Sequence, residues 1–473
     1  MPPTSGSDAF PEGFLWGVST SAYQIEGSVD ADGRGPSIWD TFSHEPGRVR
    51  GGDTGDVACD HYRRYEDDVA LMAELGVRAY RFSIAWPRIQ PEGRGSPNAR
   101  GLDFYRRLMA SLHAHGIVPV PTLYHWDMPQ ALEDAGGWPV RDTALRFADY
   151  ATAVYGALGA EAPLWITLNE PWCSAWLGYG SGVHAPGRDD PGAALAATHH
   201  LLLADAWARE TMDGGPGETG IALNIQPTRP ASDDPEDVRA AHLADLQMNA
   251  LYLDPLFGRG YPRDLVEHYR EITDLGFVRN GDLDAIHRPP DFLGVNYYRI
   301  HTVTADPDRA GGVGGLAGAL GAWSFPPPGV PVTALDWPIE PFGLTDLLVD
   351  LHREYAPRRI LVTENGAAFE DRLGPGGAID DRDRIAYLAE HVDAARRALA
   401  AGVPLEGFFV WSLLDNFEWA EGYSCRFGLV HVDFDTQVRR QKASARWFQD
   451  LIRGASGATG PPRGGGSAPT DGS

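Results

Sequence analysis

The 473-residue sequence contains few cysteines, no long apolar run and no excess of positive charge. Its three cysteines, Cys59, Cys173 and Cys425, lie far apart and lack the spacing of a metal site. We therefore expect free thiols in a reducing, cytoplasmic environment. No basic stretch followed by an apolar run opens the chain, and no later run is long enough to cross a bilayer. The sequence thus predicts neither a secretory signal nor a membrane span.

The formal net charge of −25 disfavours binding to nucleic acid and to anionic membranes, and it favours neutral small-molecule ligands. Hydrophobic residues make up 43% of the chain and charged residues 22%, which are values of a globular protein. The composition carries no information on the oligomeric state.

The sequence lacks any internal linker before its C-terminal end. From Gly454 onward it consists mainly of Gly, Pro, Ser, Ala and Thr without periodicity. This pattern predicts one folded domain over residues 1–453 and a disordered tail over residues 454–473. A second Gly-rich stretch, residues 311–321, is followed by three prolines and predicts a long mobile loop.

Strand-like and helix-like segments alternate along the rest of the chain. Predicted strands cover residues 14–20, 79–84, 118–123, 165–168, 221–225, 292–297, 360–363 and 407–411. Amphipathic helices are predicted over residues 65–75, 103–115 and 142–158. In the last of these we expect Asp142 to cap the helix and Leu145, Ala148, Ala151, Val154 and Leu158 to form the buried face. Eight such strands with helices between them favour a single (β/α)8 barrel. The alternative, a doubly wound sheet, usually has a Gly-rich phosphate loop after its first strand, and this chain has none.

Two short carboxylate motifs follow predicted buried strands: residues 167–171 (TLNEP) and residues 363–366 (TENG). A glutamate at the end of a buried strand is costly unless a charged or hydrogen-bonding group meets it. Glu170 and Glu364 could each be a helix cap or a salt-bridge partner. A pair of them in one domain instead indicates cleavage of a glycosidic bond, which uses one carboxylic acid and one carboxylate.

Polar or aromatic groups stand at the ends of all eight predicted strands, where a barrel places its catalytic groups. They are Tyr23, Gln24, Arg81, His125, Trp126, Asn169, Glu170, Asn224, Asn296, Tyr298, Glu364, Trp411, Glu418 and Trp419. Asn224 matches no catalytic role. The pair His199 and His200, near Asp205, favours helix packing over a metal site.

Nine short motifs together resemble those of the β-glucosidases of glycoside hydrolase family 1. They are residues 14–17, 24–27, 34–40, 81–83, 124–127, 167–171, 296–298, 363–366 and 416–419. The resemblance runs from about Phe10 to Ile452, so it covers nearly the whole chain apart from the tail. It implies that residues 1–453 form the catalytic domain.

The resemblance implies a retaining, two-step mechanism without metal or cofactor. Glu364 matches the nucleophile and Glu170 the general acid/base, with the two carboxyl groups about 5 Å apart. Arg81 and the Tyr298 hydroxyl would keep Glu364 ionised, whereas apolar surroundings and Glu364 itself would keep Glu170 protonated.

The resemblance also implies a sugar-binding pocket. Trp411 would lie under the sugar ring and Trp337 against the leaving group. The other pocket residues implied are Gln24, His125, Trp126, Asn169, Asn296, Tyr298, Glu418, Trp419 and Phe427. Three positions depart from the family pattern: Asp336 beside Trp337, Cys425 and His431.

The expected substrates are terminal non-reducing β-D-glucosyl residues of cellobiose-like oligosaccharides and of aryl or alkyl glucosides, which implies a role in cellulose degradation. The carboxylate of Glu418 would repel a phosphorylated sugar. Because these residues do not separate glucose from galactose, side activities on β-galactosides and β-fucosides are expected. Asp336 leaves the aglycone preference open.

Three other functions remain to be weighed. A sugar-binding protein on the same scaffold would lack one of the two glutamates, and both are present. The motifs at residues 125–126 and 416–419 disfavour an inverting barrel glycosidase. Transglycosylation uses the same covalent intermediate as hydrolysis, so the sequence does not distinguish the two.

Overall fold

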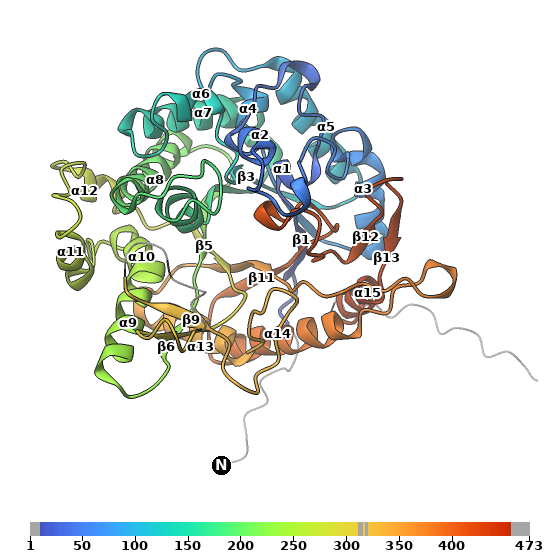
Figure 1. The fold of residues 1–473 in the computed structure, drawn as a ribbon. Helices are drawn as coiled ribbons and strands as arrows, with labels where there is room; N and C mark the ends of the chain where they lie inside the picture. The colour runs from blue at the N-terminus through green and yellow to red at the C-terminus, as the bar shows by residue number, and fades with distance from the viewer. Residues whose placement is uncertain (1–9, 311–315, 317–319, 456–473) are drawn as a thin grey trace, which may run out of the picture.

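In a computed structural model, which describes residues 10–310, 316 and 320–455, eight parallel strands close into a barrel (Figure 1). Their order around the barrel is β1-β11-β10-β7-β5-β4-β3-β2. Their bounds are β1 (Leu15–Ser19), β2 (Ala79–Ser83), β3 (Val118–Tyr124), β4 (Leu164–Asn169), β5 (Glu218–Asn224), β7 (Phe292–Asn296), β10 (Ile360–Asn365) and β11 (Leu405–Trp411). Each overlaps one predicted strand, so the (β/α)8 prediction is confirmed.

Helices surround the barrel and separate its strands (Figure 1). The longer ones are α3 (His61–Leu75), α5 (Ala99–Ala114), α7 (Arg141–Leu158), α8 (Pro191–Met212), α9 (Pro235–Asp245), α13 (Phe342–Tyr355), α14 (Arg382–Ala400) and α15 (Ala443–Ala455). Shorter ones are α1 (Ala22–Ile25), α2 (Ile38–His44), α4 (Trp86–Ile89), α6 (Gln130–Asp134), α10 (Leu251–Leu256), α11 (Arg263–Tyr269) and α12 (Asp282–Ile286). Single turns of 3-10 helix lie at η1 (Ala31–Gly33), η2 (Arg50–Gly52), η3 (Gly159–Glu161), η6 (Pro375–Gly377) and η7 (Trp419–Glu421), and π-helical turns at η4 (Cys173–Gly180) and η5 (Leu246–Ala250).

Two small sheets lie outside the barrel. One joins β6 (Thr228–Pro230), β8 (His301–Thr304) and β9 (Trp323–Phe325), and the other pairs β12 (Val430–Val432) with β13 (Arg439–Gln441). No helix among the described residues is long and apolar enough to span a membrane.

The interior of the barrel is filled by apolar side chains from all its strands. Ala79, Val120, Ile166, Phe292 and Phe409 belong to this inner cluster. The ring of Phe409 occupies the space beside Gly17, where a Cβ atom would lie 2.3 Å from a ring carbon. This tight packing fills the barrel interior, so a ligand can bind only at the carboxyl ends of the strands.

Helix α7 corrects two expectations. Val140, not Asp142, is the residue before the first turn, and the Asp142 carboxylate accepts a hydrogen bond from Arg146. Leu145 is 47% exposed, whereas Phe147 and Tyr150 are buried. Ala151, Val154 and Leu158 are buried as predicted, so the buried face differs only in the first half of the helix, where the two aromatic rings fill the core and Leu145 faces solvent. At α3, in contrast, Gly76 ends the helix in a left-handed conformation, as predicted.

The predicted tail begins inside the last turn of α15, and residues 456–473 lie outside the described residues. Most of the predicted mobile loop, residues 311–315 and 317–319, also lies outside them.

Lys442, the only lysine in the chain, is fully buried beneath the loops that follow β10 and β11. Its ammonium group pairs with Asp371 and, at 2.7 Å, with Asp415. Asp371, Asp415 and His431 are close enough together to hold a metal ion. Lys442 already supplies a positive charge to both carboxylates, and Arg426 adds another at 2.8 Å from Asp415. The cluster is therefore an ion-pair network between loops.

Candidate active site

A cavity of about 540 Å³ opens at the carboxyl ends of the barrel strands. Ten of the predicted site residues line it: His125, Trp126, Glu170, Tyr298, Trp337, Glu364, Trp411, Glu418, Trp419 and Phe427. The size is within the range of small-molecule sites. The structure thus brings together side chains that are up to 302 positions apart, from His125 to Phe427.

The other four predicted residues, Gln24, Arg81, Asn169 and Asn296, lie directly beneath this lining. All four are buried. Gln24 Nε2 donates hydrogen bonds to the Phe417 carbonyl and, at 3.4 Å, to Glu418. These residues support the groups above them through hydrogen bonds.

Glu364 lies on β10 and is held by two donors, one on β2 and one in the segment after β7. Arg81 Nη1 donates to its Oε1 at 2.5 Å, and the Tyr298 hydroxyl donates to its Oε2 at 2.6 Å. Burial raises the pKa of Glu364, while Arg81 and Tyr298 oppose that rise. The pKa of the Tyr298 phenol is raised well above its usual value by burial and by Glu364, so it remains a donor. This setting favours an ionised carboxylate at Glu364.

Glu170 follows β4, is only 5% exposed, and has only neutral donors. Asn296 Nδ2 donates to its Oε1 at 2.7 Å, and Cys173 Sγ donates to its Oε2 at 3.1 Å. Burial, followed by the charge of Glu364, raises the pKa of Glu170 to about 8. Glu170 is therefore the group that keeps its proton at neutral pH, while the donors around Glu364 favour its ionised form.

A chain of hydrogen bonds connects the two glutamates. Arg81 Nη2 donates to Asn169 Oδ1 at 2.5 Å, and Asn296 Nδ2 donates to the same oxygen at 3.0 Å as well as to Glu170. The network thus couples the position of one carboxyl group to that of the other.

Three residues of the lining adopt the left-handed backbone conformation that non-glycine residues rarely take: Trp126 (φ 74°), Glu170 (φ 46°) and Trp419 (φ 51°). Such strain costs of order 1–3 kcal/mol per residue and persists where the surrounding structure enforces it. Trp126 is fixed by a 3.0 Å hydrogen bond from its indole to the Asn169 carbonyl. The strain therefore orients side chains into the cavity.

The glycine of the second motif has a packing reason. A Cβ atom at Gly366 would lie 1.8 Å from the carbonyl oxygen of Trp411. Only glycine allows the loop after β10 to approach the end of β11 so closely. This contact fixes Glu364 relative to Trp411, whose ring stacks on that of His125 with centroids 5.6 Å apart.

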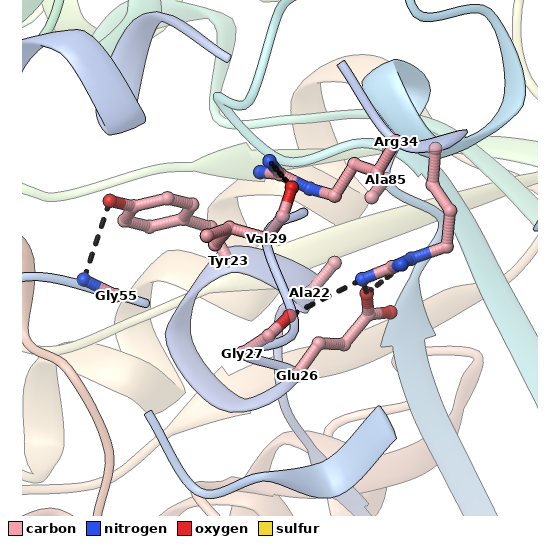
Figure 2. Close-up of a pocket in the computed structure, with 9 residues that line it drawn as sticks. Ala22, Tyr23, Glu26, Gly27, Val29, Arg34, Gly55 and Ala85 are labelled. Atoms are coloured by element: carbon pink, nitrogen blue, oxygen red, sulfur yellow. Dashed lines mark hydrogen bonds and ion pairs between the residues drawn. The ribbon is translucent and has the colours of Figure 1, made fainter. Parts of the chain in front are cut away.

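The turn that contains Gln24 is held in place by contacts of its neighbours Tyr23 and Glu26, which line the small pocket drawn in Figure 2. Glu26 points into this pocket, where Arg88 donates two hydrogen bonds to one of its oxygens at 2.9 and 3.0 Å. Tyr23 faces the opposite way, and its hydroxyl accepts a hydrogen bond from the Gly55 amide. The pocket is too small for a sugar. The contacts around it fix the turn and thereby the position of Gln24.

Glu418, which the sequence predicts to contact sugar hydroxyls, has a raised pKa. Burial, then the charges of Glu364 and Glu170, raise the pKa of Glu418 to about 8. With Glu421, four carboxyl groups thus line one cavity.

Sequence reasoning missed several residues of the cavity. Cys173, one helical turn after Glu170, donates to it, and His184 packs on Trp126 with ring centroids 5.5 Å apart. The i+3 spacing of Cys173 could have been noticed. Asn224, a strand-end residue for which the sequence predicts no role, also lines the cavity.

His199 and His200 lie away from this site. His199 contacts Asp282 at 2.8 Å and Tyr261 at 2.7 Å, whereas His200 contacts the Trp138 carbonyl. The two rings thus have different partners, which are helix-packing contacts.

The sequence matches the model of glycosyl hydrolase family 1 over residues 6–456. The chain belongs to glycosyl hydrolase family 1. It is 47% identical to "Beta-glucosidase A" of Thermotoga maritima over 449 residues, which cover 94% of this chain and 98% of that protein. It is 45% identical to the "Bifunctional beta-D-glucosidase/beta-D-fucosidase" of Bifidobacterium breve, over 94% of this chain and 98% of that protein.

Solved family 1 structures share the fold. The structure of the Thermotoga maritima β-glucosidase in complex with deoxynojirimycin matches with a TM-score of 0.89 at 46% identity, over 95% of this chain and 99% of that chain. A likeness this extensive places the whole barrel within the family.

Proposed function

We propose that this protein is a retaining β-glucosidase in which Glu364 is the nucleophile and Glu170 the general acid/base. One observation carries the proposal. Two buried carboxyl groups in one cavity have opposite settings: Glu364 is bound by a guanidinium and a phenol, and Glu170 by an amide and a thiol. Retaining hydrolysis needs one ionised and one protonated carboxyl group.

In the first step, the carboxylate of Glu364 attacks the anomeric carbon while Glu170 gives its proton to the departing glycosidic oxygen. A covalent glycosyl ester on Glu364 forms, and the aglycone leaves as an alcohol or phenol. Once Glu364 is esterified, its negative charge is gone, so the pKa of Glu170 falls.

In the second step, Glu170 acts as a base. It takes a proton from a water molecule, which attacks the same carbon and releases Glu364. The sugar leaves with its original configuration. We propose that Asn169, whose Oδ1 accepts hydrogen bonds from Arg81 and Asn296, contacts the 2-hydroxyl, and that this contact strengthens in the transition state.

The substrates are small glycosides that carry a terminal non-reducing β-D-glucosyl residue, such as cellobiose and aryl glucosides, consistent with cellulose degradation. Trp411 lies under the sugar, Trp337 beside the aglycone, and Glu418 meets the sugar hydroxyls. Activity on β-fucosides is expected because the Bifidobacterium breve relative carries both activities in its name.

We further propose that residues 1–453 act as one catalytic domain and that the protein works in the cytoplasm. Support for the compartment comes from its three free, buried cysteines.

The decisive experiment follows hydrolysis of 4-nitrophenyl β-D-glucoside by proton NMR. We expect β-D-glucose as the first-formed anomer; first formation of the α-anomer would contradict the proposal. Initial rates on nitrophenyl glucoside, galactoside and fucoside, and on cellobiose, then rank the substrates.

A further inference from the structure

Arg299 lines the cavity and has no role in the proposed mechanism. It follows Tyr298, one of the two residues that hold Glu364. Its guanidinium carbon lies 4.9 Å from the ring centre of Trp337, at a distance typical of a cation–π contact. A positive charge is thus placed beside the residue proposed to hold the aglycone.

No carboxylate of the described residues pairs with this guanidinium. The fully buried arginines Arg81, Arg88, Arg209 and Arg384 have carboxylate partners, namely Glu364, Glu26, Asp205 and Asp381. Residues 311–319, which are only partly described, contain no acidic residue. Burial alone lowers the pKa of Arg299 to about 10, so it remains charged at neutral pH.

An unpaired cation in a partly enclosed cavity is costly. The chain has 65 acidic and 40 basic residues, so acidic groups are abundant. His301, the neighbour on the same wall, offers no compensation. Its pKa is lowered well below its usual value, by burial and then by Arg299, so it is neutral. A ligand group is therefore the remaining source of a negative charge.

We propose that Arg299 binds a carboxylate on the aglycone, so that this enzyme prefers β-glucosides with an acidic aglycone. The inference rests on the proposed function and deepens it. A planar guanidinium can donate two parallel hydrogen bonds to a carboxylate, and Trp337 would support an aromatic ring that carries it. An anion on the glucosyl side is disfavoured because it would face the carboxylate proposed to be ionised, that of Glu364.

The test compares 4-carboxyphenyl β-D-glucoside with its methyl ester in the wild type and in Arg299→Met. The two substrates differ in intrinsic reactivity, but this difference cancels when the acid-to-ester ratio of kcat/KM is compared between enzymes. We expect the ratio to fall by about 10-fold or more in the variant, because a hydrogen-bonded charge pair is lost. The ratio is the readout because loss of the contact between Arg299 and Trp337 affects both substrates.

Arg353→Met is the matched control, since it removes one positive charge from an exposed position on α13. It should leave the ratio unchanged. A second measurement needs no variant: 0.5 M NaCl should lower the wild-type kcat/KM of the acid relative to the ester. Equal ratios in the wild type and Arg299→Met, or a ratio insensitive to salt, would overturn the inference while leaving the proposed function intact. If the wild type hydrolyses neither substrate, the proposed function and this inference both fail.

Discussion

The Arg81 guanidinium lies 2.5 Å from the Glu364 carboxylate and at the same distance from Asn169. Replacement by methionine should raise the pKa of Glu364, since burial would no longer be opposed by a positive charge. The acidic limb of kcat/KM against pH should move to higher pH, with a loss of about 10²-fold or more. Arg81→Lys keeps the positive charge, so its acidic limb should lie between those of the wild type and Arg81→Met. An acidic limb at the wild-type pH in both variants would contradict the role of Arg81 in ionising Glu364.

Glu170 sets the basic limb. Its carboxyl group must be protonated for the first step, and its pKa in the free enzyme is raised to about 8. Thus kcat/KM for 4-nitrophenyl β-D-glucoside should fall as the pH rises through about 8. Glu170→Gln should remove this limb and slow poor leaving groups by about 10²–10⁴-fold, but not the first step of 2,4-dinitrophenyl β-D-glucoside. A persisting basic limb in the variant would assign it to another group.

The hydrogen bond from the Cys173 thiol lowers the pKa of Glu170. Burial, then the charge of Glu170, raise the pKa of the thiol well above its usual value, so it stays a donor to the carboxyl group. Cys173→Ala removes a hydrogen bond that lowers the pKa of Glu170, and the basic limb should move to higher pH. Cys173→Ser should keep the limb near its original position. The pH profile of kcat/KM in the two variants checks this prediction. A basic limb at the same pH in both variants would show that the hydrogen bond from the thiol does not affect the pKa of Glu170.

Glu418 is expected to lower the stability of the folded state as the pH rises. Its pKa is raised to about 8, above the ordinary value of about 4.3 expected in the unfolded chain. The folded state is therefore favoured most below about pH 4.3, and this contribution to stability is lost progressively as the pH rises from there to about 8. Glu418→Gln should therefore raise Tm by about 3 °C or more at pH 8.5 and much less at pH 5. Calorimetry of both proteins at the two pH values gives the comparison; an equal shift at both would exclude titration as the cause.

Gly366→Ala tests the contact between the loops after β10 and β11. The new methyl carbon would lie 1.8 Å from a backbone oxygen, which cannot move as a flexible side chain does. We expect a loss of about 3 kcal/mol in the free energy of unfolding and a large loss of activity. Gly454→Ala, where a Cβ meets nothing within 4 Å, is the control. Wild-type urea unfolding and kcat/KM in Gly366→Ala would contradict the packing role.

Local patterns were sufficient to predict the barrel, and together with the family resemblance they predicted ten of the residues that line the cavity. Apolar runs marked all eight strands, and strand-end residues such as His125 and Glu364 reach the cavity because parallel strands end together. In the first half of α7 the buried positions were mispredicted because Leu145 fits the helical period, while Phe147 and Tyr150 bury larger rings. Arg299 could not be found from the sequence, since its significance lies in the absence of a carboxylate partner among the described residues. Only the packed loops show that.

Because Lys442 is buried, its chemical reactivity reports local opening of the structure around it. Because no other lysine exists, a reagent that acylates lysine side chains can modify this residue only when the loops over Asp371 and Asp415 separate. The mass of the undigested chain, corrected for acylation of the N-terminal amine, would then report how often these loops open, without any engineered label.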